Sequence, residues 1–276
     1  MTEDDFHFLS RLVRRRGGLA LSDGRDAQLE RRLLPVIRRF GFRDFDALMK
    51  NLRLGDDALA AAVTEAMTVN ETFFFRDKDQ FARLRHQVLP SLLAARADEK
   101  RLRIWSAACA SGQEAWSLAI LLDGMALAGW TIELIATDMS GDAITRAEAG
   151  IYSQYDVMRG LSLEDVARHF VPQERGFKIS DRLKRMVSFR KFNLMDSFGW
   201  LDDLDIVLCR NVLIHFDRAA RISVLERMAE TLSSDGVLLL GEAETPHHLT
   251  ALYQELPGGG IYTRARAQVT RLSAAI

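Results

Sequence analysis

One short segment of the chain places polar and charged side chains directly beside three aromatic rings. The segment is Asn70–Arg76, with the sequence NETFFFR, and it offers amide, hydroxyl and guanidinium groups. A solvated loop rarely carries consecutive phenylalanines, and an apolar core helix rarely carries a fixed charge beside them. The segment therefore predicts a site in which polar ligand groups lie against a hydrophobic wall formed by Phe73, Phe74 and Phe75, with the Arg76 cation at its edge.

A second group of candidate residues lies in Ala107–Glu114, which follows an apolar run typical of a buried strand. The small residues of this loop would let a ligand approach the backbone closely. The loop has neither the G-x-G-x-x-G spacing of a dinucleotide site nor the lysine of a P-loop. We therefore expect no pyrophosphate cradle, and the acidic Glu114 favours a cationic ligand group such as the ammonium of an amino acid.

Polar residues also follow the next three predicted strands. Asp138 ends the second strand, where a carboxylate can accept hydrogen bonds from ribose hydroxyls. Asn193–Leu194 and Asn211–Val212 follow the third and fourth strands, so two amides are expected at the same rim. Ribose, an ammonium and no phosphate together indicate S-adenosylmethionine as the ligand.

The hydrophobic pattern divides the chain into two parts that must position these residues. Up to about residue 67 the apolar residues recur at helical spacing, which predicts four short helices with Asp44 and Asp56 as N-caps. From residue 102 strands alternate with helices, which predicts an α/β fold with a mainly parallel, doubly wound sheet. The predicted strands are 102–106, 131–137, 187–192, 205–209, 237–240 and 261–263, and the predicted helices are 114–127, 143–149 and 218–232.

The expected organisation has three segments: a helical domain over residues 1–67, a connector over 68–100 and a ligand-binding domain over 101–276. The connector carries Asn70–Arg76 and one further predicted helix. Within the last domain, about residues 172–190 read as a small β excursion before the third strand.

Composition excludes several classes of protein. The 276 residues carry a net charge of −1, so nothing draws the whole chain to nucleic acid, and no aromatic-and-basic binding motif is present. No apolar run approaches the roughly 20 residues of a membrane span, and the chain begins with acidic residues. Cys109 and Cys209 form neither a disulfide framework nor a metal cluster. We expect a cytoplasmic monomer that binds no metal.

These segments together resemble the chemotaxis receptor methyltransferase (CheR) family, whose members methylate glutamate carboxylates on the cytoplasmic helices of chemoreceptors. The resemblance covers nearly the whole chain. It rests on segments in the same order as in the family: Thr68–Arg76, Ile104–Glu114, Ala136–Asp138, Gly150–Tyr152, Phe192–Leu194, Cys209–Asp217 and Gly241–Glu244. It implies an all-helical N-terminal domain followed by a Rossmann-like class I methyltransferase domain with a C-terminal antiparallel strand.

The resemblance also implies a role for each candidate residue. Arg76 and His215 would be the catalytic residues, and Glu114 and Asp138 would hold the methionine ammonium and the ribose of S-adenosylmethionine. His215 stands where the family usually has tyrosine, near the methyl acceptor. If its imidazole, which ordinarily titrates near 6.5, faces the acceptor, activity should depend on pH near neutrality and His215→Tyr should remove that dependence. The other residues implied to line the pocket for cofactor and acceptor are Asn70, Thr72, Asn193, Leu194, Asn211 and Val212.

The chemistry that the resemblance implies needs neither a metal nor a general base. A glutamate carboxylate is already ionised at pH 7, with a reference pKa near 4.3. Attack on the sulfonium methyl removes charge, so a dry pocket favours it. The guanidinium of Arg76 would hold one carboxylate oxygen while the other attacks.

The partner implied by the resemblance is the set of methylation helices of membrane chemoreceptors. The N-terminal helices are locally basic and would provide a docking surface for those acidic helices. The arginines concerned are Arg11, Arg14, Arg15, Arg16, Arg31, Arg32, Arg38 and Arg39. Some family members grip a receptor tail peptide with the small β excursion, and the sequence does not decide whether this chain does.

Simpler interpretations stay open for several of these residues. Asn70, Thr72 and Asp138 could be helix caps with no further role. Arg76 could be a surface ion-pair partner, and His215 could be a structural residue. The three phenylalanines are expected to be core packing that shapes the pocket wall, and the two cysteines small packing residues. Two alternative functions also remain: a noncatalytic sensor or scaffold that binds S-adenosylmethionine or its product S-adenosylhomocysteine, and methylation of a small molecule.

Overall fold

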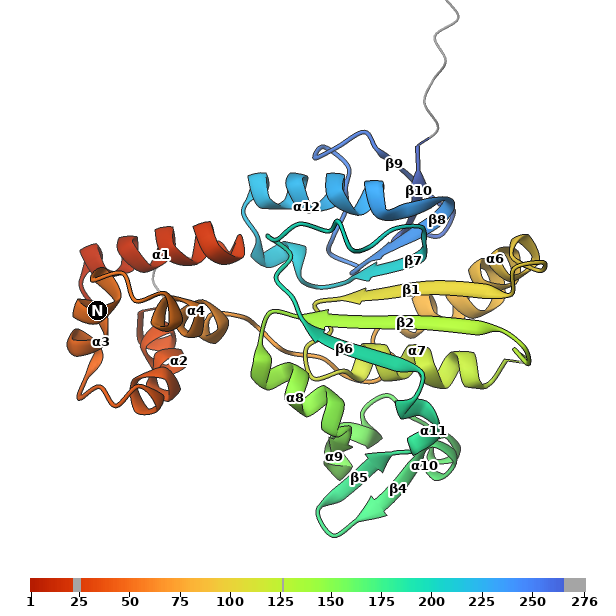
Figure 1. Cartoon of the computed structure of the whole chain (residues 1–276), viewed down its shortest axis with the longest axis horizontal. Helices are drawn as coiled ribbons and strands as arrows, with labels where there is room; N and C mark the ends of the chain where they lie inside the picture. The colour runs from red at the N-terminus through yellow and green to blue at the C-terminus, as the bar shows by residue number, and fades with distance from the viewer. Residues whose placement is uncertain (22–25, 126, 266–276) are drawn as a thin grey trace, which may run out of the picture.

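The computed structural model describes residues 1–21, 26–125 and 127–265 of the chain. Four helices form a small domain beside the larger α/β domain (Figure 1). They are α1 (Glu3–Gly17), α2 (Asp26–Arg39), α3 (Phe45–Arg53) and α4 (Asp57–Ala66). Asp44 and Asp56 cap α3 and α4 by accepting hydrogen bonds from Ala47 N and Leu59 N, at 2.9 and 3.0 Å. The predicted helical domain and these two caps are confirmed.

The connector has no regular structure until α5 (Lys78–Arg83). From there the chain runs through a π-helical turn, η1 (Leu84–Val88), into α6 (Leu89–Ala95). One helix was predicted through this stretch. The structure instead has three successive helical segments, each burying apolar residues in the core of the α/β domain.

The main sheet has seven strands in the order β6-β2-β1-β7-β8-β10-β9. The first five run parallel, while β10 and β9 pair antiparallel, so the predicted sheet with its C-terminal antiparallel strand is confirmed. The strands are β1 (Arg101–Ala107), β2 (Thr131–Asp138), β6 (Val187–Lys191), β7 (Leu204–Cys209), β8 (Leu232–Leu240), β9 (Tyr253–Glu255) and β10 (Ile261–Arg264). The strand order reverses between β1 and β7, the position at which open α/β sheets bind ligands.

Helices cover both faces of this sheet. In Figure 1, α12 (Arg218–Thr231) lies on one side, and α7 (Gln113–Asp123) and α8 (Gly141–Ala149) lie on the other. Alternate residues of each strand point to opposite faces, so Trp105 and Val207 belong to one core and Ile104 and Ile206 to the other. The first core continues without a break into the apolar centre of α1–α4.

A second, three-stranded antiparallel sheet confirms the predicted β excursion, although its strands begin earlier in the chain than expected. It is formed by β3 (Ile151–Tyr152), β5 (Gly176–Ile179) and β4 (Phe170–Gln173), in that order. Three short helices surround it: α9 (Gln154–Met158), α10 (Leu163–His169) and α11 (Asp181–Lys184). The stretch that begins at Val187, which fell at the end of the expected excursion, is β6 of the main sheet.

Candidate functional site

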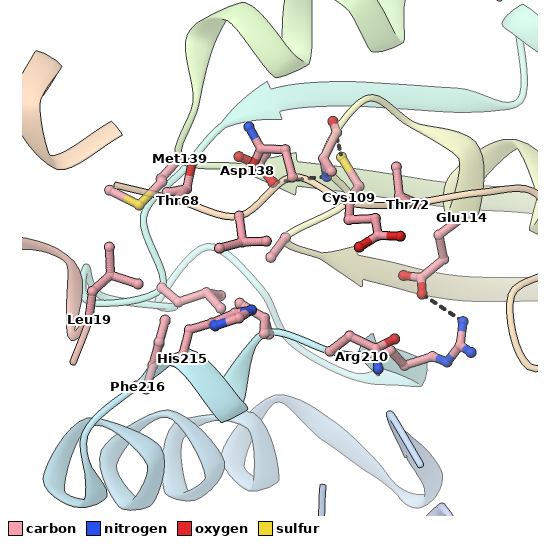
Figure 2. Close-up of a pocket in the computed structure, with 18 of the residues that line it drawn as sticks. Leu19, Thr68, Thr72, Cys109, Glu114, Asp138, Met139, Arg210, His215 and Phe216 are labelled. Carbon is pink, nitrogen blue, oxygen red and sulfur yellow. Dashed lines mark hydrogen bonds and ion pairs between the residues drawn. The ribbon is translucent and has the colours of Figure 1, made fainter. Parts of the chain in front are cut away.

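One pocket lies beyond the carboxyl ends of β1, β2 and β7, and the connector closes it from the side (Figure 2). The structure brings all ten predicted site residues to the lining of this pocket. Their roles remain predictions. The lining residues are Leu19, Thr68, Val69, Asn70, Glu71, Thr72, Phe73, Arg76, Ala108, Cys109, Ala110, Glu114, Asp138, Met139, Phe192, Asn193, Leu194, Arg210, Asn211, Val212, His215 and Phe216.

Asp138 is held at the end of β2 by two backbone donors. Its carboxylate oxygens accept hydrogen bonds from Ala110 N at 2.9 Å and Ser140 N at 2.8 Å. Burial raises the pKa of Asp138 above its ordinary value, although these two bonds oppose the shift. The helix cap of α8 is Ser140, whose hydroxyl accepts from Ala143 N. Asp138 therefore organises the loop after β1 and keeps lone pairs available toward the pocket.

The loop after β1 has an unusual backbone that brings it close to the pocket. Ala108 and Ala110 have φ values of 57° and 49°, a left-handed conformation that alanine rarely adopts. Gly112 has φ 93°, and a Cβ there would lie 2.8 Å from that of Ala147. Strained residues of this kind persist where the surrounding structure holds them, often at ligand sites.

Glu114 lies in the first turn of α7 with both carboxylate oxygens engaged. Oε1 accepts from Ser106 Oγ at 2.8 Å, and Oε2 accepts from Arg210 Nη1 at 3.0 Å. Glu114, which was predicted to hold an ammonium group, is thus already in an ion pair with Arg210. Arg210 follows β7 directly and its side chain is only 2% exposed. Sequence reasoning assigned it no role, and the only signal was a fixed charge placed directly after an apolar strand.

The three phenylalanines of the connector do not share one environment, which corrects the expectation of a three-ring wall. Phe74 is fully buried against Tyr152 and Phe170. Phe75 has φ 49° and packs against Phe81. Of the three, Phe73 is the one in the described lining of the pocket.

Arg76 is half-buried at the edge of the pocket with its charge available. Its Nη1 donates to the carbonyl of Glu71 at 3.1 Å, and its guanidinium lies 5.6 Å from the ring centroid of Phe73. No carboxylate among the described residues pairs with it in the manner of a surface ion pair. A guanidinium held by a neutral carbonyl and an aromatic face can still receive an incoming carboxylate.

The two predicted amides tie the pocket to other parts of the molecule. Asn193 donates from Nδ2 to the carbonyl of Arg16 in α1, at 2.7 Å. Asn211 has φ 60° and donates its backbone N–H to the carboxylate of Glu244 at 2.7 Å. Glu244 also accepts from Ile214 N at 3.1 Å and is 6% exposed, so it fixes the segment that leads to His215. Glu244 lies in a segment that carries the family resemblance, but its sequence position gave no sign of this contact.

His215 ends a short 3-10 helix, η2 (Leu213–His215), and its half-buried side chain lines the pocket opposite Asp138 (Figure 2). Burial lowers the pKa of His215, and the nearby charges of Arg32, Arg221 and Arg76 lower it further, while Glu244 opposes them. The imidazole is therefore neutral at pH 7.

The helical domain reaches this side of the pocket through the residues after α1. Leu19, which lines the pocket, forms a β-bridge with Phe216, and Ala20 N donates to the carbonyl of His215 at 2.8 Å. Sequence reasoning missed Leu19 because nothing in a single apolar residue after a helix indicates such a contact.

Cys109 and Cys209 are both buried and free, and burial raises the pKa of each thiol well above its usual range. They are packing residues in this state. Among the described residues, no cluster of three or more His, Cys, Asp or Glu side chains is placed to hold a metal ion. None of the described helices combines the length and apolar character needed to cross a membrane.

Comparison with known proteins gives matches over almost the whole chain. Residues 4–68 match the all-alpha domain of CheR methyltransferases, and residues 70–258 match the CheR methyltransferase S-adenosylmethionine-binding domain. The chain is 35% identical to chemotaxis protein methyltransferase 1 of Pseudomonas aeruginosa, over 95% of this chain and 98% of the relative. It is 33% identical to chemotaxis protein methyltransferase Cher2 of Pseudomonas putida, over 91% of this chain and 93% of the relative.

Among solved structures, the chain is similar to the DhpI–SAH complex. The match has a TM-score of 0.34 and 17% sequence identity, and it covers 70% of this chain and 71% of that chain. So weak a structural likeness adds nothing to the sequence matches.

Proposed function

This chain belongs to the CheR methyltransferase family, the S-adenosylmethionine-dependent methyltransferases of chemotaxis, and from that premise we propose its acceptor and its mechanism. The proposed acceptors are glutamate side chains on the cytoplasmic methylation helices of chemoreceptors, and the products are glutamate methyl esters. The observation that carries this proposal is the position of Arg76. It offers an available cation at the rim of a pocket whose interior presents Glu114 and Asp138.

The residues of the pocket fit the methyl donor by their chemistry. The buried carboxylate of Asp138 would accept hydrogen bonds from the ribose hydroxyls, and Glu114 would hold the ammonium of the methionine part. The residues proposed to frame the adenine and the methionyl chain are Asn193, Leu194, Asn211 and Val212, with Asn70 and Thr72 on the connector side. When bound, S-adenosylmethionine supplies a sulfonium methyl group that a carboxylate can attack directly.

The residues of the chain then have only to bind, align and exclude water. The glutamate of the receptor is ionised at neutral pH, so no residue has to remove a proton. Holding the two reacting groups in line supplies several kcal/mol of the rate enhancement in well-oriented systems. A pocket that excludes water also favours a step in which opposite charges disappear.

Arg76 is proposed to orient the acceptor. One N–H of its guanidinium would hold one oxygen of the glutamate carboxylate and leave the other oxygen free to attack. Tight bidentate binding would stabilise the charged ground state and slow the transfer. The existing contacts of Arg76 with Glu71 and Phe73 restrict its approach and favour a single positioning contact.

A surface on α2 is proposed to dock the receptor. Arg31, Leu34, Pro35 and Arg38 are all exposed and recur at helical spacing, so they share one face of the helix. Leu34 is 44% exposed between two arginines. An apolar side chain flanked by cations is suited to an amphipathic helix with acidic residues.

The test is incubation of the protein with radiolabelled S-adenosylmethionine and a receptor cytoplasmic fragment. Base-labile label on glutamate is the expected result. Binding of S-adenosylmethionine without any transfer would identify a noncatalytic sensor or scaffold, and label recovered outside protein would identify a small-molecule methyltransferase. Arg76→Lys is the matched variant, since it keeps the charge but not the planar donors, and we expect it to lower the rate at saturating donor about tenfold or more.

A further inference from the structure

Arg210 occupies the point where the sheet, the first turn of α7 and the connector meet. Its guanidinium makes four hydrogen bonds to described residues, each to a different acceptor. Nε donates to Gln80 Oε1 at 2.8 Å and Nη1 to Glu114 Oε2 at 3.0 Å. Nη2 donates to the carbonyl of Arg76 at 2.7 Å and to Asp77 Oδ2 at 2.6 Å. A planar fork with fixed donor directions thereby sets the relative positions of three separate chain segments.

The charges of this cluster do not balance. One guanidinium faces two carboxylates, those of Glu114 and Asp77, so the trio carries a net charge of −1 when all three groups are ionised. A buried cluster with one unbalanced negative charge is stabilised by a further positive group. Glu114 lines the pocket, whereas Asp77 lies outside its described lining. Of the two carboxylates, Glu114 is therefore the one that presents negative charge to a ligand in the pocket.

The connector turn that carries Arg76 is strained on both sides of the carbonyl that Arg210 holds. Phe75 and Asp77 have φ values of 49° and 59°, in the left-handed region that side chains disfavour. Asp77 stands at the N-cap of α5, yet its carboxylate caps none of the described N–H groups of that helix and is turned to Arg210 instead. The sequence favours capping at that position, so the ion pair overrides the local preference.

We propose that Arg210 is a positioning residue that fixes Glu114 at the amino-acid end of the donor site and the Arg76 backbone at the acceptor side as one unit. This inference rests on the proposed function, because it assumes that Glu114 receives the donor's ammonium. The proposal predicts that substitutions of Arg210 and Asp77 weaken the binding of ligands that carry the amino-acid group and leave the binding of ligands without it unchanged.

The test compares the binding of two ligands, S-adenosylhomocysteine and 5′-methylthioadenosine, by calorimetry. Both contain the nucleoside and a thioether, but only the first carries the amino-acid group with its ammonium and carboxylate. For Arg210→Lys we expect S-adenosylhomocysteine to bind about tenfold or more weakly, because one ammonium cannot reach four acceptors. We expect 5′-methylthioadenosine to bind within about threefold of the wild-type value. A general loss of structure would weaken both ligands alike, so that result would overturn the proposal.

Asp77→Asn tests the same idea without removing the guanidinium. Asparagine keeps the size of the side chain and a carbonyl oxygen for Arg210, and no described cap of α5 is lost. The substitution removes the unbalanced negative charge from a residue outside the described lining. The proposal predicts several-fold weaker binding of S-adenosylhomocysteine and unchanged binding of 5′-methylthioadenosine. Equal binding of S-adenosylhomocysteine by Asp77→Asn and the wild type would contradict it.

Arg96 provides a matched control near the opposite end of β7, because it pairs with Asp205 at the start of that strand whereas Arg210 follows its end. It is also a largely buried arginine between two carboxylates, with Asp205 at 2.9 Å and Asp235 at 3.0 Å. Arg96→Lys carries the generic cost of replacing such an arginine, and neither ligand should bind differently. If it shifts the binding of the two ligands as Arg210→Lys does, the effect is structural and Arg210 has no special position.

A double-mutant cycle completes the test. Since Arg210 is proposed to act through Glu114, Arg210→Lys and Glu114→Gln should weaken S-adenosylhomocysteine binding non-additively. Additive effects would overturn the coupling. Failure of the wild-type protein to bind either ligand would instead contradict the donor site itself, and failure to methylate the receptor fragment while this binding pattern holds would contradict only the proposed acceptor.

Discussion

A single buried carboxylate, that of Asp138, both organises the loop after β1 and faces the proposed ribose position. For Asp138→Asn we expect the free energy of unfolding to fall by about 1–3 kcal/mol, because the amide nitrogen must face one of two backbone N–H groups. Affinity for S-adenosylhomocysteine should fall about tenfold or more. Denaturant titration and calorimetry measure the two quantities.

Ser140→Ala is the control for that experiment. It removes the cap of α8, which costs about 0.5–2 kcal/mol of stability, but it leaves the Asp138 carboxylate in place. We expect its ligand affinity to match the wild type. Equal losses of affinity in the two variants would show that Asp138 acts only through the stability of the loop.

We expect the pH dependence attributed to His215 to appear at lower pH than the ordinary pKa of histidine suggests, because burial lowers the pKa of this side chain. Its folded-state pKa is depressed, so the imidazole is neutral above about 6.5 and acquires charge only as the pH falls below that value. The added cation would repel the sulfonium, and the apparent KM for S-adenosylmethionine should rise on the acid side. Receptor carboxylates stay ionised over most of this range. His215→Tyr should remove the acid limb, and an identical KM–pH profile in the variant would show that His215 does not face the donor.

The same depressed pKa contributes to folding stability with a defined sign. The neutral form is favoured in the folded state, so the contribution is fully present above about pH 6.5 and is lost as the pH falls toward the folded-state pKa.

At the residue scale, the sequence identified the side chains of the pocket that carry recognisable chemistry. Asp138 could be predicted because ligands of such sheets bind beyond the carboxyl ends of parallel strands, and Glu114 because it is the acidic residue at the end of the loop after the first strand. Arg210, Glu244 and Leu19 could not, because their importance lies in which distant atoms they contact. Gln80 and Arg210, for example, are separated by 130 residues and meet only in the folded molecule.

At the element scale, the connector is held by a close backbone contact that predicts a sensitive glycine. Gly160, in the turn between α9 and α10, has φ 112°, and a Cβ there would lie 1.9 Å from the carbonyl oxygen of Phe74. Gly160→Ala should therefore displace the segment that carries Phe73 and Arg76. We expect a loss of more than about 2 kcal/mol in the free energy of unfolding and weaker ligand binding, measured by denaturant titration and calorimetry.

Gly41→Ala is the control that distinguishes the cost of a positive φ from the cost of the clash between residue 160 and Phe74. Gly41 also has a positive φ, at 70°, but a Cβ there would meet no described atom within 4 Å. It should cost only about 1 kcal/mol and leave ligand binding unchanged. If both variants lose the same stability, the contact between Gly160 and Phe74 does not hold the connector.

Elements with a strong hydrophobic period could be predicted from the sequence, and elements defined by pairing could not. β7 is buried along its whole length, and its apolar run identified it. β8 begins at Leu232, whereas the sequence predicted a start at 237. The prediction missed the first residues because α12 runs directly into the strand and because Ser233 and Asp235 interrupt the apolar pattern. β9 and β3 have three and two residues, too few to show a period, and they exist because neighbouring strands pair with them.

At the scale of the whole molecule, the helical domain and the α/β domain share one continuous apolar core beside the pocket. The apolar centre of α1–α4 is continuous with the core under α12. Polar contacts also cross the boundary, including Asn193 to the carbonyl of Arg16 and an ion pair between Lys191 and Glu65. A receptor helix docked on α2 would therefore be held by a domain that directly supports one wall of the proposed active site.

This arrangement predicts that docking and donor binding respond differently to charge. Arg31→Glu with Arg38→Glu changes the net charge from −1 to −5, because each substitution removes one positive and adds one negative charge. We expect receptor methylation at low salt to fall about tenfold or more, since the acidic helix would meet a repelling face. Affinity for S-adenosylhomocysteine should stay within about twofold, because screening over about 8 Å at physiological salt isolates the pocket from exposed charges.

The matched control reverses two exposed arginines outside the helical domain, Arg85 and Arg185, and reaches the same net charge of −5. If docking uses the face of α2, this control should methylate the receptor fragment at nearly the wild-type rate, and only wild type and control should lose rate steeply as salt is added. Equal losses in the two double variants would mean that the acceptor senses total charge, and the docking surface would then have to lie elsewhere.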